Sequence, residues 1–599
     1  MASADEGTPP GGSDEGRAAG PPPVARRDPA AVMRLARLGA FHQTRLSFMR
    51  QLTRRLQRER WTFSRAVFEV DANGVGHAVL CAHGPERSYS LVAFAHDLPA
   101  GQRSDRVIAE AWDATFALFD GVPDEADVAR LAANVPRQEA GRIAQTELTL
   151  SRANRSVRLW EYVLESLASG RQPELARIDE VGYLMRTTAV YGSGKFGACD
   201  RENVAARAEL AAPFQAEMLT VYLIRAFVRD LVEHMARSRG GSAAVPLAPE
   251  VARRIGIGNS TGLGMAPFIV NHPRLFDRWI GAREEALARV RGVERASEAA
   301  RASFRELLER SIESAARWHS AHPLQRERIA GLREDLDALR AHVGAAATLE
   351  GTRPWDRLYR HAAGTLGMEC QECLVSLLLE PYGELVDGLA DTMADDVAAE
   401  PPIDGRATVG KMRRVLEAVH GWALGLDWDD REQIARAWYV SAEKLEPRLG
   451  ERFEEPIAPY EQPLAPARDA VALHRALAGL PDEAPVAGFL LAHPEHRHAL
   501  RRLQIVARAP YAEIRDNTIS SSVMPIDMLR AKLSFFGAVH FDPRSDRWVR
   551  ICLYGNAPYP EELAEGEADR WPYPPLASPA EAGGVDALDP HASRGRIPA

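Results

Sequence analysis

Apolar residues recur with helical spacing through most of the chain between residues 104 and 530. The clearest example lies within 205–238, where Pro213 suits a first turn and apolar side chains cover more than one face. Apolar positions that wide around the axis predict a helix buried in the middle of a bundle. Helical spacing with interleaved basic residues covers 30–59, and further helices are predicted at 281–345 (broken near Ser320–Pro323), 354–380, 407–424, 430–445 and 467–479.

Strand-like patterns occur near both ends of this helical region. Residues 61–70, 76–83 and 88–96 alternate or run apolar at strand length, with turn residues between them, which predicts a three-stranded meander. A hairpin is predicted at 538–542 and 547–554. Each piece is marginal alone, so we expect the two to pair. The predicted fold class is mainly α, a multi-helix core with a small antiparallel β-sheet built from N-terminal (61–96) and C-terminal (538–554) strands.

The length of 599 residues predicts roughly two to four packed units. Both ends are rich in Pro, Gly, Ala and acidic residues and are predicted to be disordered. The predicted divisions are a tail at 1–29, a helix plus meander at 30–100, a helical domain with glycine-rich loops at 101–280, a helical domain at 281–480, a helix, loop and hairpin at 481–559 that complete the core, and a tail at 560–599.

Composition and charge exclude several classes of protein. The formal charge is −9 with Lys and Arg dispersed among Asp and Glu, which argues against a nucleic-acid-binding face. Five cysteines do not make a disulfide framework in so long a chain. An acidic N-terminus without an apolar core is not a secretory signal, and no run of about 18 apolar residues predicts a spanning helix. A soluble protein of the cytoplasm is therefore expected, with no membrane partner.

The first candidate site is a glycine-rich loop at Tyr191–Gly197. Its three glycines let consecutive backbone N–H groups point inward as an anion-binding nest. Arg186, Ser193 and Lys195 would add donors around a phosphate or carboxylate. The Walker pattern GxxxxGK[ST] is not matched. A tight turn with a solvated Lys195 explains the glycines equally well, and a Schiff-base role for Lys195 would need a desolvated amine.

A second glycine-rich loop spans Gly256–Gly264. Its spacing is like that of a dinucleotide-binding loop, but it follows a basic helical segment instead of a buried strand, so a Rossmann site is not supported. Asn259, Ser260 and Thr261 lie among apolar residues and must hydrogen-bond either their own backbone or a ligand. We interpret them as ligand contacts, while Asn271 suits a helix cap.

Two further groups of residues carry candidate chemistry. Helix 213–235 places Glu217, Arg225, Asp230 and His234 among apolar positions, where burial would shift a titration toward acid–base use; structural ion pairs are the alternative. A polar segment at 515–527 would end in a helix N-terminus that binds anions or simply caps the helix. Its candidate contacts are Arg515, Asn517 and Ser521.

Two cysteine and histidine motifs are not assigned a role. Cys370 and Cys373 form a CxxC inside an apolar helical run, without the strand or the further ligands that redox or zinc chemistry needs. His493–His498 lacks the spacing of a metalloprotease motif and suits an exposed helix start.

The leading hypothesis is a cytosolic enzyme acting on a small anionic metabolite by acid–base elimination, isomerisation or group transfer. Its catalytic candidates are Glu217, His234 and Lys195, and its substrate-binding candidates are Arg186, Ser193, Asn259, Ser260, Thr261, Arg515, Asn517 and Ser521. The alternatives are a flavin- or nicotinamide-dependent oxidoreductase with a non-Rossmann site, and a non-catalytic helical assembly protein using 281–345. No cofactor is identified, no metal site is predicted, the expected partner is a small-molecule ligand, and homo-oligomerisation is left open.

Overall fold

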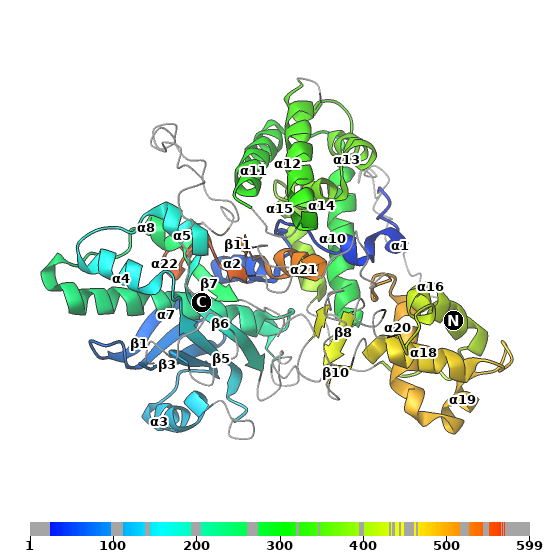
Figure 1. Cartoon of the computed structure of the whole chain (residues 1–599), viewed down its shortest axis with the longest axis horizontal. Helices are drawn as coiled ribbons and strands as arrows, with labels where there is room; N and C mark the ends of the chain where they lie inside the picture. Colours follow the sequence, from blue (N-terminus) through cyan, green and yellow to red (C-terminus); the bar gives the residue numbers. More distant parts are fainter. Residues whose placement is uncertain are drawn as a thin grey trace, which may run out of the picture.

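The structure of the chain is a computed structural model (Figure 1). It describes residues 24–97, 112–137, 144–192, 204, 207–259, 273–318, 323–345, 348–393, 401–430, 433, 438–441, 445–447, 461–462, 465–515, 526–538, 540–542, 550–564, 566 and 568.

The main sheet is mixed and nine-stranded, with the order β1-β2-β3-β4-β5-β6-β7-β12-β11. Every neighbouring pair is antiparallel except β6 and β7, which run parallel. The strands are β1 (Thr62–Val70), β2 (Gly76–His83), β3 (Ser88–Ala95), β4 (Ala114–Asp120), β5 (Glu147–Arg155), β6 (Tyr183–Gly192), β7 (Gly256–Asn259), β11 (His540–Asp542) and β12 (Arg550–Leu553). The prediction of a small antiparallel sheet made only of terminal strands is therefore wrong.

Four strands that the pattern did not predict separate the meander from the C-terminal hairpin. β4 is apolar on both faces, and the others carry polar residues at buried positions, so these strands lack the alternation of apolar and polar positions that marks a half-buried strand. Thr149 of β5 is an example, since it is fully buried and its hydroxyl lies 2.6 Å from that of Thr220. Tertiary contacts thus satisfy polar groups that look exposed in the sequence.

The sheet curls around one long helix, α7 (Gln215–Gly240), which confirms the predicted buried helix. Tyr222 of α7 contacts Phe63 of β1, with ring centroids 6.1 Å apart, and Tyr554 just after β12, at 5.3 Å. Strands near both ends of the sheet order therefore meet the same helical residue. The result is a half-barrel filled by α7, at the left of Figure 1.

The buried Arg225 of α7 binds the segment after β12 to the half-barrel through hydrogen bonds. Its guanidinium donates to the carbonyls of Ile255, at 2.7 Å, and Ala557, at 2.8 Å. It also stacks on the Tyr559 ring, 3.8 Å from the centroid. A buried arginine is stable only when its donors are used in this way. Arg225, which the sequence grouped with possible acid–base residues, therefore has a structural role.

Helices around the half-barrel complete this part of the molecule. α3 and η3 cover its outer face through a separate small core that includes Leu131 and Val135, while α4 packs on α7. These elements are α3 (Glu125–Asn134), η3 (Val135–Arg137), α4 (Trp160–Ala168), α5 (Leu175–Val181), η4 (Ala208–Leu210), η5 (Gly241–Ala243), α8 (Pro249–Arg254) and α22 (Pro560–Leu563).

A helical bundle adjoins the half-barrel in the upper part of Figure 1. Its helices occupy the regions predicted at 281–345 and 354–380, with an additional break at 292–297. They are α10 (Pro273–Arg291), α11 (Glu298–Ala316), α12 (Pro323–Gly344), α13 (Pro354–Thr365) and α14 (Met368–Leu379), followed by α15 (Gly383–Val386), η6 (Asp387–Met393) and, later in the chain, α21 (Ile526–Phe536).

The first described segment is held against this bundle by ion pairs. Arg27 binds the buried carboxylates of Glu284, at 2.7 Å, and Glu372, at 2.8 Å. Only α1 (Pro29–Val32), the 3₁₀ turn η1 (Leu35–Arg37) and α2 (Phe48–Arg58) are helical, so the helical region expected over 30–59 is interrupted by irregular chain at 38–47. The apolar residues of that interruption, such as Phe41 and Leu46, are buried by tertiary contacts instead of by a helix of their own.

A smaller helical unit lies at the right of Figure 1 and has its own apolar core. Two antiparallel segments join its halves, because Val409 N–H donates to the Ala484 carbonyl and Val486 N–H to that of Ala407. Its elements are α16 (Val409–Leu424), α18 (Ala465–Leu477), α19 (Val486–Ala492), η8 (Pro494–His496) and α20 (Arg497–Arg508).

Part of the helix expected at 430–445 is instead strand. Trp438–Ser441 forms β8, between β9 (Leu445–Pro447) and β10 (Glu461–Gln462) in a separate three-stranded sheet. Aromatic and β-branched residues such as Tyr439 and Val440 favour that conformation once a partner strand is present. None of the described helices combines the length and the apolar character needed to cross a bilayer.

Candidate functional site

The parallel strands β6 and β7 carry the start of both predicted glycine-rich loops. Thr187 is in register with Asn259, and Arg186 with Gly258. Parallel strands point their carboxyl ends toward the same edge of a sheet. The two predicted loops therefore follow adjacent strands, although β6 continues to Gly192, beyond its last partner in β7. Ser193, Lys195, Ser260 and Thr261 lie outside the described residues.

Arg186 and Asn259 face opposite sides of the sheet. Asn259 pairs with Ile551, which belongs to the core around α7, so its side chain faces that helix. Arg186 pairs with Gly258, one position away, and side chains alternate along a strand. Both are buried, at 4% and 1% exposure for Arg186 and Asn259. The described structure therefore does not place these two predicted contacts on one ligand.

The first glycines of the second loop are explained by close packing of strands. A Cβ at Gly256 would lie 2.3 Å from the Leu553 carbonyl oxygen, and one at Gly258 would lie 2.5 Å from the Tyr183 ring. Neither contact is compatible with a larger residue. These glycines let β7 fit between β6 and β12, which is a structural duty distinct from cradling a phosphate.

Glu217 lies in the first turn of α7 and is buried at 3% exposure. Thr220, one turn later on the same face, meets Thr149 of β5, and Thr149 is in register with Gly192 at the end of β6. The first turns of α7 thus lie at the end of the half-barrel toward which β6 runs. Glu217 and Asn259 both face the interface between α7 and the sheet.

His234 lies at the other end of α7. Its Nε2 is 3.1 Å from the Asp71 carbonyl in the turn between β1 and β2, and its ring packs on Phe68. Seventeen residues of helix separate it from Glu217, a span of about 25 Å. The structure therefore does not bring these two catalytic candidates together, because a helix that long carries its ends to opposite edges of the sheet.

Arg515 belongs to yet another region. Its backbone N–H donates to the Met33 carbonyl at 2.7 Å, next to α1. Burial lowers the pKa of Arg515, and the charge of Asp28 partly opposes that effect. Figure 1 places α1 on the side of the molecule away from β6 and β7. Arg515 does not join those strands, and Asn517 and Ser521 lie outside the described residues.

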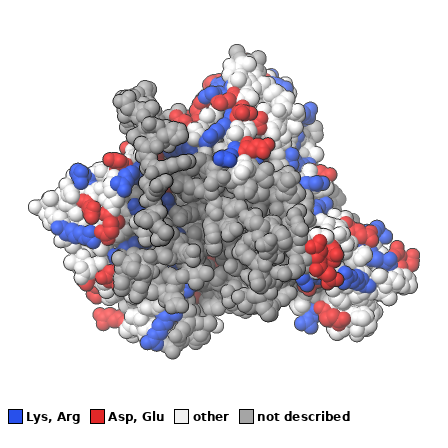
Figure 2. Space-filling view, viewed as in Figure 1, with Lys and Arg blue, Asp and Glu red and all other residues white. Residues whose placement is uncertain are grey.

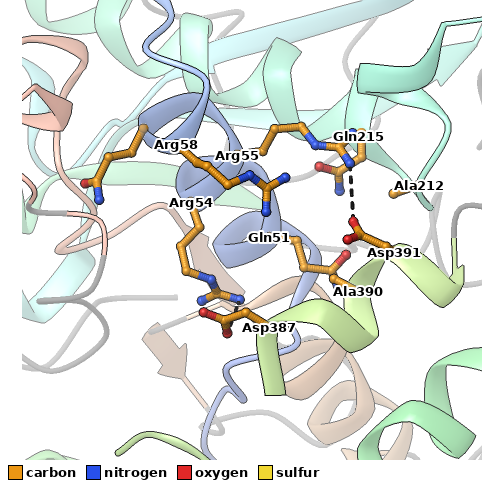
Figure 3. Close-up of a pocket in the computed structure, with 10 residues that line it drawn as sticks. Gln51, Arg54, Arg55, Arg58, Ala212, Gln215, Asp387, Ala390 and Asp391 are labelled. Carbon is orange, nitrogen blue, oxygen red and sulfur yellow. Dashed lines mark ion pairs between the residues drawn. The ribbon is translucent and has the colours of Figure 1, made fainter. Parts of the chain in front are cut away.

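A pocket that the sequence did not single out opens between α2, η6 and the start of α7 (Figure 3). It has a volume of about 190 Å³. One side is a polar stripe of α2, whose members recur at helical spacing because they share a face. The lining residues are Gln51, Arg54, Arg55, Gln57, Arg58, Ala212, Gln215, Asp387, Ala390 and Asp391.

The arginines of this stripe face two carboxylates of η6. Arg54 lies 3.5 Å from Asp387, and Arg55 lies 3.8 Å from Asp391. Burial acts to raise the pKa of Asp387, but the hydrogen bond from Arg45 and the charges of Arg54 and Arg45 outweigh it, so the pKa is lowered. Asp387 therefore stays ionised, whereas Arg58 is 61% exposed and is paired only with Glu59, at 3.8 Å, among the described residues.

The start of α7 adds backbone donors next to the pocket. The helix has no side-chain cap, and its N-cap Phe214 adopts a left-handed conformation with φ of 58°. That conformation is uncommon for a bulky residue and is held here by packing of the Phe214 ring on Phe48 and Phe536. A helix N-terminus carries partial positive charge, so it reinforces the arginines beside Gln215.

The described residues offer little support for metal or thiol chemistry. They contain no group of three His, Cys, Asp or Glu residues able to hold a metal ion. Cys370 and Cys373 are both buried, and burial raises the pKa of Cys373 to about 12. A thiol that resists ionisation is a poor nucleophile and ligand.

Surface charge is mixed where the structure describes it. Figure 2 shows acidic and basic side chains interspersed over the helices at the top and the right of that view.

No protein-family model, no curated protein and no solved structure matches this chain. Only the geometry of the sites therefore indicates a function.

The signal for the pocket was present in the sequence. Gln51, Arg54, Arg55 and Arg58 recur at intervals of three and four residues opposite the buried Leu52 and Leu56. Such a stripe is ordinarily a solvated helix face. Only the folded structure shows that it is opposed by η6 and walled in by the residues before α7.

Proposed function

We propose that this protein binds a small anionic metabolite in the pocket between α2, η6 and the start of α7. The observation that carries the proposal is the stripe formed by Arg54, Arg55 and Arg58, with three guanidinium groups facing one cavity (Figure 3). Guanidinium groups are suited to phosphate and carboxylate because their donors form a planar fork. The proposed ligand is still a small anion, as expected from the sequence, but the proposed site differs from the glycine-rich loops.

The residues that line the pocket carry an excess of positive charge. Three arginines face two aspartates, and the start of α7 adds partial positive charge. Glu59, outside the lining, lies 3.6 Å from Arg55 and 3.8 Å from Arg58. Arg55 is held by the carbonyls of Ala208, at 3.0 Å, and Glu209, at 2.7 Å, so it is positioned before any ligand binds. Because water reaches the site, we expect affinities in the millimolar to micromolar range, about −4 to −8 kcal/mol.

Binding, without an assigned reaction, is what the pocket supports. Asp387 is a weak base because its arginine neighbours stabilise the ionised form. Glu217 follows Gln215 by two residues on α7 and is the predicted acid–base residue nearest in sequence to this site. Because Glu217 does not line the pocket, Glu217→Gln should leave ligand binding unchanged.

The experiment compares thermal unfolding of the full chain with and without inorganic phosphate and succinate. Binding to the native state adds about 2.7 kcal/mol at a ligand concentration 100 times Kd, so the wild-type Tm is expected to rise. Arg58→Gln should reduce that rise at least several-fold. Arg239→Gln is the matched control, because Arg239 is an exposed arginine at the far end of α7. If neither ligand raises the wild-type Tm, or both variants respond alike, the pocket is not the anion site.

A further inference from the structure

We infer that the ligand of this pocket carries a hydrogen-bond donor, an ammonium group, beside its anionic group. This inference rests on the proposed function and names the ligand class. The pocket combines two kinds of group, the guanidinium groups of α2 and acceptor oxygens that come from Gln51 of the same helix and from η6. A simple anion would use only the guanidinium groups.

Gln51 provides an acceptor that nothing in the described chain uses. The residue is 7% exposed, and its Oε1 has no hydrogen-bond partner among the described residues. Its amide nitrogen is committed to the Leu46 carbonyl and lies 3.7 Å from the sulfur of Met393. A buried acceptor without a donor is unfavourable, and a ligand N–H would satisfy it.

Asp391 provides a second acceptor. Its side chain is 63% exposed, and its partner in the pocket is Arg55 at 3.8 Å, too long for a hydrogen bond. Asp387 differs, because Arg45 already binds both of its oxygens, at 2.6 and 2.7 Å. Among the described lining residues, unused acceptor capacity therefore lies with Gln51, with Asp391 and with Gln215, whose amide nitrogen donates to the carbonyls of Phe48 and Pro213.

Together with the arginines, these acceptors suit a small zwitterionic ligand. An ammonium group has three donors, which we assign to the Gln51 oxygen and the Asp391 carboxylate, while the anionic group is assigned to Arg54, Arg55 and Arg58. A volume of about 190 Å³ suits a ligand of the size of an amino acid or an aminoalkyl phosphate. Anions that carry a hydroxyl group in place of the ammonium group would satisfy Gln51 but gain less from Asp391.

The test uses two probes of the same shape. O-phosphoethanolamine carries phosphate and ammonium, and propyl phosphate replaces the ammonium by a methyl group. We expect calorimetry on the full chain to show at least about tenfold tighter binding of phosphoethanolamine, which corresponds to about 1.4 kcal/mol. Asp391→Asn and Gln51→Met should each bring the ratio of the two affinities toward one, and Arg58→Gln should weaken both probes.

The outcomes separate this inference from the proposal on which it rests. If both probes bind the wild type equally well, the ammonium site is overturned while the anion site stands. If neither probe binds, the anion site falls with it. Asp391 is well exposed, so Asp391→Asn provides a folded test even if Gln51→Met unfolds the chain. Retention of tenfold selectivity in Asp391→Asn would exclude Asp391 as an ammonium contact.

Discussion

Individual buried side chains in this protein are tuned by the groups packed around them. His42 lies in the irregular segment before α2, with Nε2 3.1 Å from the Ser311 hydroxyl and its ring 5.3 Å from that of Trp318. Burial lowers the pKa of His42 to about 3 from an ordinary value of 6.5. The native state therefore holds a neutral imidazole where the unfolded chain would be protonated in mild acid.

That shift predicts a loss of stability in acid. Between pH 6.5 and about 3 the unfolded state binds a proton at His42 that the native state does not, so stability falls as the pH falls. The limit is about 1.4 kcal/mol per pH unit, or about 2 kcal/mol between pH 6.5 and pH 5. The measurement is urea unfolding of wild type and His42→Gln across this range.

The difference in pH-dependent stability between wild type and His42→Gln isolates the contribution of His42. Buried His420 and paired carboxylates such as Glu372 also make the wild type sensitive to acid, but the variant keeps them. His42→Gln should be the less stable protein at neutral pH and lose stability less steeply in acid. If the stabilities of wild type and His42→Gln changed equally with pH, the pKa of His42 would not be lowered in the native state.

At the scale of elements, the half-barrel depends on how closely its strands approach one another. β7 is short and lies between β6 and β12. Its Gly256 leaves no room for a Cβ beside the Leu553 carbonyl, whereas Gly281 in α10 has its nearest such neighbour, an atom of Tyr511, at an ordinary 3.8 Å. The same substitution should therefore have opposite effects in the two elements.

We predict that Gly256→Ala destabilises the protein by about 1–3 kcal/mol, because the added methyl group forces β7 and β12 apart. Gly281→Ala should stabilise it by up to about 1 kcal/mol, since alanine is the better helix former and the space is free. Chemical denaturation of the two variants against wild type measures both effects. Equal destabilisation by the two substitutions would contradict the close approach of β7 to β12.

At the scale of the whole molecule, one helical unit has an apolar cluster of its own. The unit of α16, α18, α19 and α20 buries this cluster, which includes Leu473 and Leu416, while Ala423 of α16 and Val471 of α18 pack into the large core that the half-barrel and the bundle share. Units with separate cores can open independently, with free energies below that of global unfolding.

Leu473→Ala should therefore weaken one unit selectively. Truncating a buried leucine costs about 2–5 kcal/mol, and here the loss should appear as faster amide exchange in α16, α18 and α20. Exchange in α7 and in strands β2–β5 should be unchanged. Hydrogen–deuterium exchange with peptide-level resolution measures both regions, and uniform acceleration across the chain would show a single cooperative unit.

Whether an element could be predicted from the sequence depends on how far along the chain the contacts of its side chains lie. α7 could be predicted because apolar residues from Met218 to Met235 surround its axis, and the meander because its strands alternate around short turns. β5 and β6 could not, since Thr149 and Thr187 look solvated until Thr220 and Asn259 are placed beside them. The glycines at 256 and 258 suggested a ligand, whereas strand packing explains them.

Local sequence patterns were sufficient for the elements whose periodicity arises from neighbours a few residues away, including the polar stripe of α2. What that stripe faces depends on the fold, because Asp387 and Asp391 lie more than 300 residues further along the chain. The fold also separates Glu217 from His234 and Arg186 from Asn259, since helix length and strand alternation direct their side chains to different surfaces. Contacts of that kind come from chain topology, which local patterns do not encode.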